Sequence, residues 1–198
     1  MHDVERTANL LGAAALALTD LMFAELAHAG GLSASGAAAL VTLGAAPDLS
    51  VTELGRRVGL SQPAAARMVD GLERRAFARR APGAGREVSV RLTPAGEGIA
   101  ARLTGARTQA LAGPLAALDQ GQLAALDGAL SGLLAALYRR VGSADLLCRL
   151  CDRERCTRGA PCPVGQAGRE VGQAGRDVGE AGREVGQAGR RVGQAGRQ

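Results

Sequence analysis

The chain has 198 residues, a formal net charge of +5, and aromatic residues at only 2% of its positions. All 24 basic residues are arginine. A core must therefore be built from Leu, Val and Ala, which favours packed helices and argues against an all-β barrel or sandwich. The apolar stretches Ala8–Leu18 and Ala37–Ala46 are shorter than the roughly 20 residues of a membrane span, so we expect no membrane partner.

The amino-terminal residues also argue against export. Asp3 and Glu5 stand where a signal peptide carries basic residues. We therefore expect a cytoplasmic protein, in which the four cysteines are thiols or metal ligands rather than disulfides.

Two apolar helices are predicted first. Residues Asp3–Ala29 carry leucines at three- and four-residue spacing, and Gly30-Gly31 ends that helix. A second helix covers about Ser35–Leu43, and the breaker Ala46-Pro47-Asp48 follows it.

The strongest local signals come next and predict a helix-turn-helix. Ser50 and Glu53 have the spacing of a capping box. Gly59 stands just after the end of this helix, where glycine is preferred because the backbone is left-handed. Ser61 is a second N-cap with Pro63 in the first turn, and that second helix runs to about Arg75. Two helices joined by a turn of about four residues that contains glycine form this motif.

A hairpin and two long helices complete the predicted domain. Phe77–Arg80 and Val88–Leu92 read as two strands of a wing, joined by the Gly/Pro-rich link Ala81–Glu87. Thr93 and Pro94 open a helix that continues to about Leu111, where Gly113-Pro114 is expected to break it. A last amphipathic helix spans about Gln122–Tyr138.

Positive charge is concentrated on this helix-turn-helix and wing. Between Ser50 and Arg91 there are nine arginines and four acids, a balance of +5 that equals the charge of the whole chain. Such a surface is typical of phosphate binding, and the second helix of the motif is expected to enter the major groove of duplex DNA. Gln62 can pair with an adenine edge, Arg67 with guanine or phosphate, and alanine methyls with thymine. The candidate DNA-binding residues are Ser61, Gln62, Ala64, Ala66, Arg67 and, at the wing tip, Arg86.

The same residues resemble a known family. The run TELGRRVGLSQPAAARMVDGLERRAFARR, followed by GREVSVRLTPAGEGI, is similar to the MarR family of bacterial winged-helix regulators, over about Asp3–Arg140. The resemblance implies a dimer built from the first helix and the last two, with two recognition helices on a palindromic operator. It matches Arg67 to the recognition-helix arginine and Arg86 to the wing arginine. It also implies repression that a small phenolic effector relieves.

Two positions depart from the family pattern. Ala84 stands where the family has an aspartate that braces the wing arginine, and Ala66 replaces a hydroxyl residue of the recognition helix. Direct reading of bases is therefore expected to be sparse, and the shape of the duplex more important.

A homodimer is also expected from the leucines alone. The first and last helices have more apolar surface than a small DNA-binding core can cover. Burying such side chains between two protomers contributes about 1.5–3 kcal/mol each before entropy costs.

Four cysteines form a compact group behind the last helix. Their spacing, Cys148-x2-Cys151-x4-Cys156-x5-Cys162, suits a tetrahedral zinc ion, although it is not the common CxxC…CxxC form. A reversible dithiol switch and the absence of any site are the alternatives.

The carboxyl-terminal residues 164–198 repeat a seven-residue unit five times, VGQAGRE in its first copy. Ten glycines would cost a helix about 10 kcal/mol relative to alanine, so we expect a disordered or weakly helical tail.

The sequence thus predicts a mainly α protein: a winged helix-turn-helix with flanking dimerisation helices and a two-stranded β wing. Its expected parts are a dimerisation helix (1–34), the DNA-binding domain (35–97), two further dimerisation helices (98–142), the cysteine cluster (143–163) and the tail (164–198). No nucleophile–base pair stands out in the sequence, so we do not expect an enzyme. The alternatives to an effector-released regulator are a zinc- or redox-responsive regulator and an interaction module that has lost DNA binding.

Overall fold

The computed structural model describes residues 3–28, 31–83 and 88–173. Its helices are α1 (Val4–His28), α2 (Ala34–Ala45), α3 (Val51–Val58), α4 (Gln62–Arg74), α5 (Pro94–Leu115), α6 (Gln120–Val141), α7 (Ala144–Leu147) and α8 (Arg153–Thr157). A further helix covers residues 163–173. The strands are β1 (Leu49–Ser50), β2 (Ala78–Pro82) and β3 (Val88–Leu92). The predicted mainly helical, winged-helix fold is confirmed.

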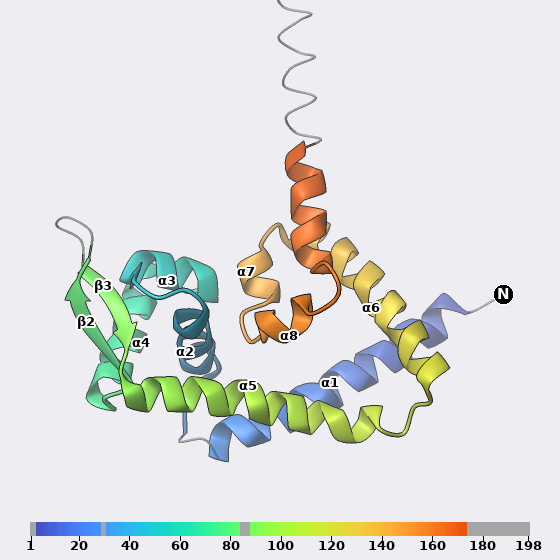
Figure 1. The fold of residues 1–198 in the computed structure, drawn as a ribbon, viewed down its shortest axis with the longest axis horizontal. Helices are drawn as coiled ribbons and strands as arrows, with labels where there is room; N and C mark the ends of the chain where they lie inside the picture. The colour runs from blue at the N-terminus through green and yellow to red at the C-terminus, as the bar shows by residue number, and fades with distance from the viewer. Residues whose placement is uncertain (1–2, 29–30, 84–87, 174–198) are drawn as a thin grey trace, which may run out of the picture.

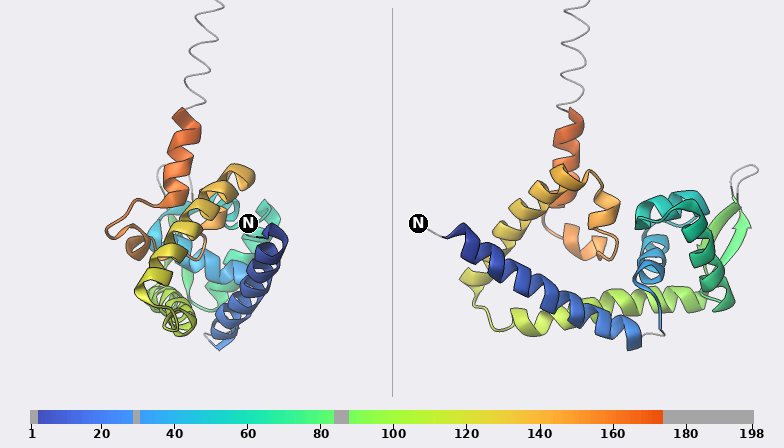
Figure 2. Two further views of the ribbon diagram at one scale, coloured as in Figure 1. Left: turned by 90° about the vertical axis from the view of Figure 1, so that its right-hand side faces the viewer. Right: turned by 180° about the vertical axis from the view of Figure 1, so that it is seen from behind.

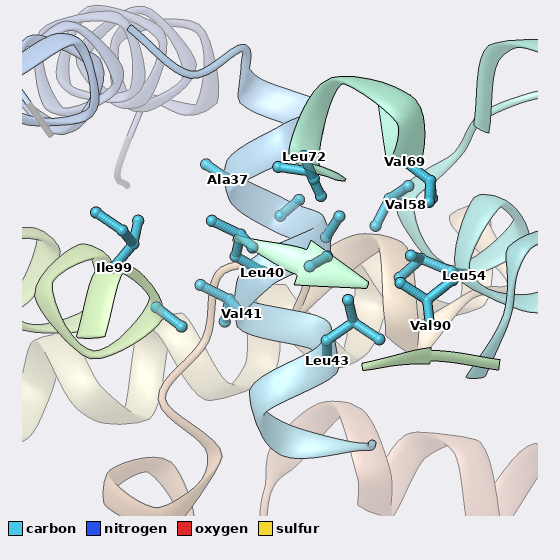
Figure 3. Packing of buried hydrophobic residues seen from close by; sticks show 14 of the residues in the cluster. Ala37, Leu40, Val41, Leu43, Leu54, Val58, Val69, Leu72, Val90 and Ile99 are labelled. Carbon is cyan, nitrogen blue, oxygen red and sulfur yellow. The ribbon is translucent and has the colours of Figure 1, made fainter. Parts of the chain in front are cut away.

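Helix α2 is the centre of the core. Ser33 caps its amino end by accepting a hydrogen bond from the Gly36 amide at 3.1 Å. Its small residues let α3, α4, α5 and β3 approach closely, and Leu40 is fully buried among them (Figure 3). Leu54 of α3, Val69 of α4 and Val90 of β3 are buried in the same cluster. This packing fixes the helix-turn-helix against the sheet.

The two helices of the motif begin and end close to the predicted residues. Ser50 accepts the Glu53 amide at 3.2 Å, but the Glu53 side chain binds arginines instead of closing the capping box. Gly59 ends α3 with a φ of +76°, as predicted. Ser61 precedes α4, but its hydroxyl makes no capping hydrogen bond.

The wing is part of a three-stranded antiparallel sheet in the order β1-β3-β2. The prediction of two strands missed β1, because Leu49–Ser50 is too short to show alternation. Strand β2 continues to Pro82, two residues beyond the predicted end. Arg80 pairs with Val90 in the register of β2 and β3. The wing tip, with the predicted site residue Arg86, lies outside the described residues.

Helix α5 runs along the longest dimension of the molecule (Figure 1). It starts at the predicted Thr93 cap, which accepts the Gly96 amide at 3.1 Å. The predicted break at Gly113-Pro114 is wrong, since the helix continues through both residues to Leu115. A proline this close to the end of a helix removes only one of its backbone hydrogen bonds, so the last turn survives.

Helix α1 packs along the distal half of α5 in the opposite direction, and α6 turns away from the far end of α5 (Figures 1 and 2). Asp119 and Gln122 form a complete capping box at the start of α6. None of the α6 residues is buried in the single chain. The winged helix therefore sits at one end of α5, and largely uncovered helices occupy the other end.

The segment Val4–Ala24 is long and apolar enough to cross a membrane, with a mean hydropathy of 1.4. The expectation from Ala8–Leu18 was wrong on length, because polar residues on either side do not lower the average enough. A signal sequence near the N-terminus and the buried core helix of a soluble protein pass the same test. None of this segment is buried in the single chain, although its helix packs on α5.

The first copy of the carboxyl-terminal repeat is helical, against the expectation of a disordered or weakly helical tail. In the helix at residues 163–173, Val164 and Ala167 are almost fully buried. Gly168 lies so close to Tyr138 of α6 that a Cβ would stand 3.1 Å from the tyrosine oxygen. Burial of one small-residue face offsets the cost of the glycines here. Residues 174–198 lie outside the described part of the chain.

Ala76 ends α4 in a conformation that glycine adopts more readily. Its φ is +55°, its amide donates to the Glu73 carbonyl, and the Phe77 amide donates to the Leu72 carbonyl, as in a Schellman motif. We expect Ala76→Gly to change the free energy of unfolding by about +0.5 to +1 kcal/mol, because the left-handed strain exceeds the added chain entropy. Urea unfolding measures this. Ala95→Gly in the exposed first turn of α5 is the control and should be destabilising, and a loss at both positions would contradict the assignment.

Candidate nucleic-acid interface

Helix α4 presents its first turn and one side to solvent. Ser61, Gln62 and Arg67 are exposed, whereas Ala65, Val69 and Leu72 on the opposite face are buried. Ala64 and Ala66, which were predicted to be exposed, are half-buried, so only part of each methyl is accessible. The exposed face therefore offers one amide, one hydroxyl and one guanidinium for contacts with a ligand.

The helix approaches α3 very closely behind this face. A Cβ added to Gly55 of α3 would lie 2.6 Å from the Cβ of Ala65, which is too short for any real contact. The crossing of the two helices therefore depends on glycine at one position and alanine at the other. This contact fixes the direction in which α4 points.

A second contact holds α4 to the wing. Arg80 of β2 forms ion pairs with Asp70, at 2.8 Å, and with Glu73. The backbone amide of Arg80 also donates to Glu73 at 2.8 Å. Asp70 is the main cause of a raised pKa for Arg80. Arg80 thus pairs with both acids and braces the wing against α4, a contact that the sequence did not predict.

Asp48 holds the other edge of the sheet. Its carboxylate accepts hydrogen bonds from Arg91, in an ion pair, and from the Ser89 hydroxyl at 3.2 Å. The Arg91 hydrogen bond lowers the pKa of Asp48. Asp48 has a φ of +65°, which aspartate tolerates better than most residues. This contact braces β3.

The remaining positive charge is free to meet an anion. In the described part of the chain, Arg67, Arg74 and Arg79 are exposed and form no ion pair. Arg67 and Arg74 border an open hollow between α4 and the start of α2, about 430 Å³ in volume. The paired arginines, Arg80 and Arg91, stabilise the packing of α4 and the sheet. Arg67, Arg74 and Arg79, without an ion pair in the described chain, lie on the surface of α4 and the wing.

Comparison with known proteins identifies this arrangement. The sequence model of the MarR family matches residues 23–87, which include α2 to α4 and the start of the wing. Over these residues the chain is similar to the MarR family. No curated protein sequence matches the chain.

Solved MarR structures have the same fold. A MarR family protein from Bacillus stearothermophilus superposes with a TM-score of 0.61 at 24% identity, over 69% of this chain and 99% of its own. FabT of Streptococcus pneumoniae, solved in complex with DNA, gives 0.60 at 17% identity over 69% and 99%. Rv2887 of Mycobacterium tuberculosis, also solved with DNA, gives 0.52 at 25% identity over 67% and 98%. The chain therefore has the fold of MarR transcription regulators, a family of regulators rather than enzymes.

Glu53 forms ion pairs within α3, the first helix of the helix-turn-helix. It accepts hydrogen bonds from Arg56 at 2.8 Å and Arg57 at 2.7 Å, and these lower its pKa to about 2. The ionised carboxylate therefore stabilises the fold above its ordinary pKa of 4.5, and this contribution is lost as the pH falls toward 2.

We expect Glu53→Gln to flatten the pH dependence of unfolding between those two values. The loss near neutral pH should be no more than about 1 kcal/mol, because the side chain is one-third exposed and water screens the pairs. Urea unfolding from pH 2 to pH 7 measures this. Glu97→Gln is the matched control, since Glu97 is exposed and forms no ion pair in the described chain. Parallel curves for wild type and Glu53→Gln would contradict the assignment.

The chain beyond α6 forms an extension that packs against the winged-helix domain. Helix α7 contacts both α3 and α6 (Figure 1). Asp145 accepts a hydrogen bond from Arg56 of α3 at 3.1 Å, and the methyl of Leu146 lies 3.0 Å from the position of a Cβ on Gly59. The extension therefore rests on the turn of the helix-turn-helix, which sequence reasoning did not predict.

The four cysteines lie together in this extension. Cys148, Cys151, Cys156 and Cys162 are free thiols that line one cavity of about 200 Å³. A hydrogen bond from Cys151 lowers the pKa of Cys148 and raises that of Cys151, and burial raises the pKa of Cys156 to about 11. As these thiols stand, no group of three or more His, Cys, Asp and Glu side chains in the described chain is set to hold a metal ion.

Proposed function

We propose that this protein is a cytoplasmic, homodimeric repressor that binds a palindromic DNA operator. The observation that carries the proposal is the surface of α4 and the wing, where Gln62, Arg67 and Arg79 are exposed on a braced MarR scaffold. Gln62 and Arg67 would contact base edges, Ser61 and Arg86 the phosphate backbone or a minor groove, and the half-exposed methyls of Ala64 and Ala66 a thymine.

Exposed apolar side chains on α1 and α6 support the dimer. Leu16 of α1 is 71% exposed and Leu10 is 51% exposed. Leu130, Leu137 and Val141 of α6 are more than one-third exposed. A single chain leaves this surface in water, and a second copy across a two-fold axis would cover it. The axis would place two α4 helices about 34–36 Å apart, one turn of DNA.

A groove between the two halves of the chain suits an effector. It has a volume of about 850 Å³ and is bordered by α2, β3, α5 and residues 151–154. Apolar residues of α2 and α5 border it, and its charged lining balances, with three arginines and three acids: Arg79, Arg91, Arg153, Glu97, Asp152 and Glu154. We propose that a small molecule with an apolar body binds here and changes the angle between the winged helix and α5. Repression and release by such a ligand rest on the family resemblance.

The test has two parts. Light scattering should give the mass of two chains, and selection from random duplexes should return a palindrome with half-sites one helical turn apart. Arg67→Ala should then weaken binding to the selected duplex by about 1–3 kcal/mol, whereas the control Arg102→Ala on the exposed face of α5 should not. A single-chain mass, or no preference for any duplex at low salt, would overturn the proposal.

A further inference from the structure

The carboxyl-terminal cysteines are not needed for the DNA-binding surface, yet the fold gathers all four around one cavity. We propose that Cys148, Cys151, Cys156 and Cys162 bind one thiophilic metal ion, with Zn²⁺ as the representative, and that the bound ion fixes the extension against α3. The donor set is four sulfurs, which suits a d¹⁰ ion in tetrahedral coordination.

The backbone places the sulfurs in a closed group. The Cys151 amide donates to the Cys148 carbonyl at 2.9 Å, so these residues form a tight turn that keeps both side chains near each other. The side chains then interact in series, from Cys148 to Cys151, from Cys151 to Cys156 on α8, and from Cys156 to Cys162. Four residues from three separate turns of chain thus face the same cavity.

Cys162 is held as a metal ligand would be. It stands at the start of the helix at residues 163–173, where the Gln166 amide donates to its carbonyl at 2.8 Å. The Gly165 amide donates to its sulfur at 3.5 Å. The amide contact therefore holds the Cys162 sulfur at the edge of the cavity.

Surrounding arginines compensate the charge that metal binding creates. Four thiolates around a divalent ion carry a net charge of −2, and Arg153 lines the same cavity. Arg107 of α5 acts on Cys151 through its charge, and the Arg107 Nε is buried without a hydrogen-bond partner in the described chain. A thiolate cluster would place negative charge beside this half-buried arginine.

Binding replaces one set of interactions with another. In the protonated form the four thiols carry no charge. An ion would displace one proton from each thiol, and the four sulfurs must move inward to bind it, because no group of three or more ligands in the described chain is already placed to hold a metal ion. Four S–H bonds break and four metal–sulfur bonds form, with no change of oxidation state.

The site is linked to the helix-turn-helix by Asp145. Its carboxylate accepts hydrogen bonds from Arg153, at 3.4 Å, and from Arg56 of α3, at 3.1 Å. Arg153 lines the cysteine cavity, so one carboxylate joins the metal site to the first helix of the motif. Metal loading should therefore change operator affinity by about 5–150-fold, a consequence that rests on the proposed function.

The first experiment needs no DNA. The full chain, reduced and freed of metal by a chelator, is titrated with Co²⁺ and then with Zn²⁺. We expect one ion per chain, visible bands of a tetrahedral Co²⁺–thiolate site, and loss of those bands when Zn²⁺ displaces Co²⁺. Cys151→Ser and Cys156→Ser should weaken or remove the bands, and Thr157→Ser, which keeps the hydroxyl beside the same cavity, should not.

Two results would overturn the site. One is the absence of thiolate-bound Co²⁺ in the wild-type chain, which does not depend on any variant folding. The other is rapid formation of a Cys148–Cys151 disulfide with peroxide, found by peptide mapping, in protein that binds no metal, because that result assigns the thiols to redox chemistry.

The second experiment measures operator affinity with and without Zn²⁺. Asp145→Asn should still bind one ion but lose the response of the DNA affinity to Zn²⁺. Metal binding without any effect on DNA in the wild type would contradict the link through α3 and leave the metal site standing. No DNA binding under either condition would instead contradict the proposed function.

Discussion

We expect the affinity for the selected operator to fall by about 10³–10⁵ between 50 and 200 mM salt. The residues from Ser50 to Arg91 carry the whole net charge of +5, and the dimer presents this surface twice. Arginine contacts to about 6–10 phosphates would release counterions from the DNA, and this release gives the stated loss of affinity. Titration of labelled operator at five salt concentrations, followed by fluorescence anisotropy, measures the slope.

A single substitution makes this prediction sharper. Arg79 is exposed and forms no ion pair in the described chain, so Arg79→Ala should not disturb the fold. If each copy contacts one phosphate, the slope of log K against log salt should become shallower by about 1.8, twice the value of 0.9 per contact. Arg80→Ala provides the contrast, because it removes the ion pairs to Asp70 and Glu73 and should lower stability. A slope near zero in the wild type would indicate a module that has lost DNA binding.

Signals that lie close together in the sequence predicted the helix-turn-helix well. A serine before each helix, glycine at position 59 and proline in a first turn act within a few residues, and the helices begin and end near those residues. The wing followed from the alternation in Val88–Leu92. The candidate DNA-binding residues remain predictions. Among those that the structure describes, Ala64 and Ala66 are less exposed than expected, and Arg86 lies outside the described residues.

The contacts that could not be predicted join residues far apart in the chain. Arg80 meets an acid ten residues away, and Arg56 meets an acid 89 residues away. Many pairings of arginines with acids are compatible with the same sequence, so the local sequence pattern does not determine which arginine pairs with which acid. The helix at residues 163–173 shows the same limit, since the penalty for its glycines is local and the burial of Val164 is tertiary.

The second prediction concerns the crossing of α3 and α4, where Gly55 faces Ala65. The space between the two helices holds the methyl group of Ala65 but not a second methyl group on residue 55. Gly55→Ala would place a Cβ 2.6 Å from that of Ala65, and both residues are fully enclosed in the core. We expect a loss of about 1–3 kcal/mol in the free energy of unfolding, since the helices must move apart. Urea unfolding at one fixed protein concentration measures the loss and avoids the concentration dependence of a dimer.

The exchanged pair distinguishes overpacking from other effects of the substitution. Ala65→Gly alone should cost about 1 kcal/mol in helix propensity and a further amount in lost packing. If overpacking is the cause, Gly55→Ala with Ala65→Gly should be less destabilised than the sum of the single variants, by about 0.5–3 kcal/mol. Gly98→Ala is the matched control, because nothing lies within 4 Å of its added Cβ, and it should be neutral or stabilising. Strict additivity would contradict a direct clash. Operator affinity should recover with stability in the exchanged pair, because the same contact directs α4 toward the DNA.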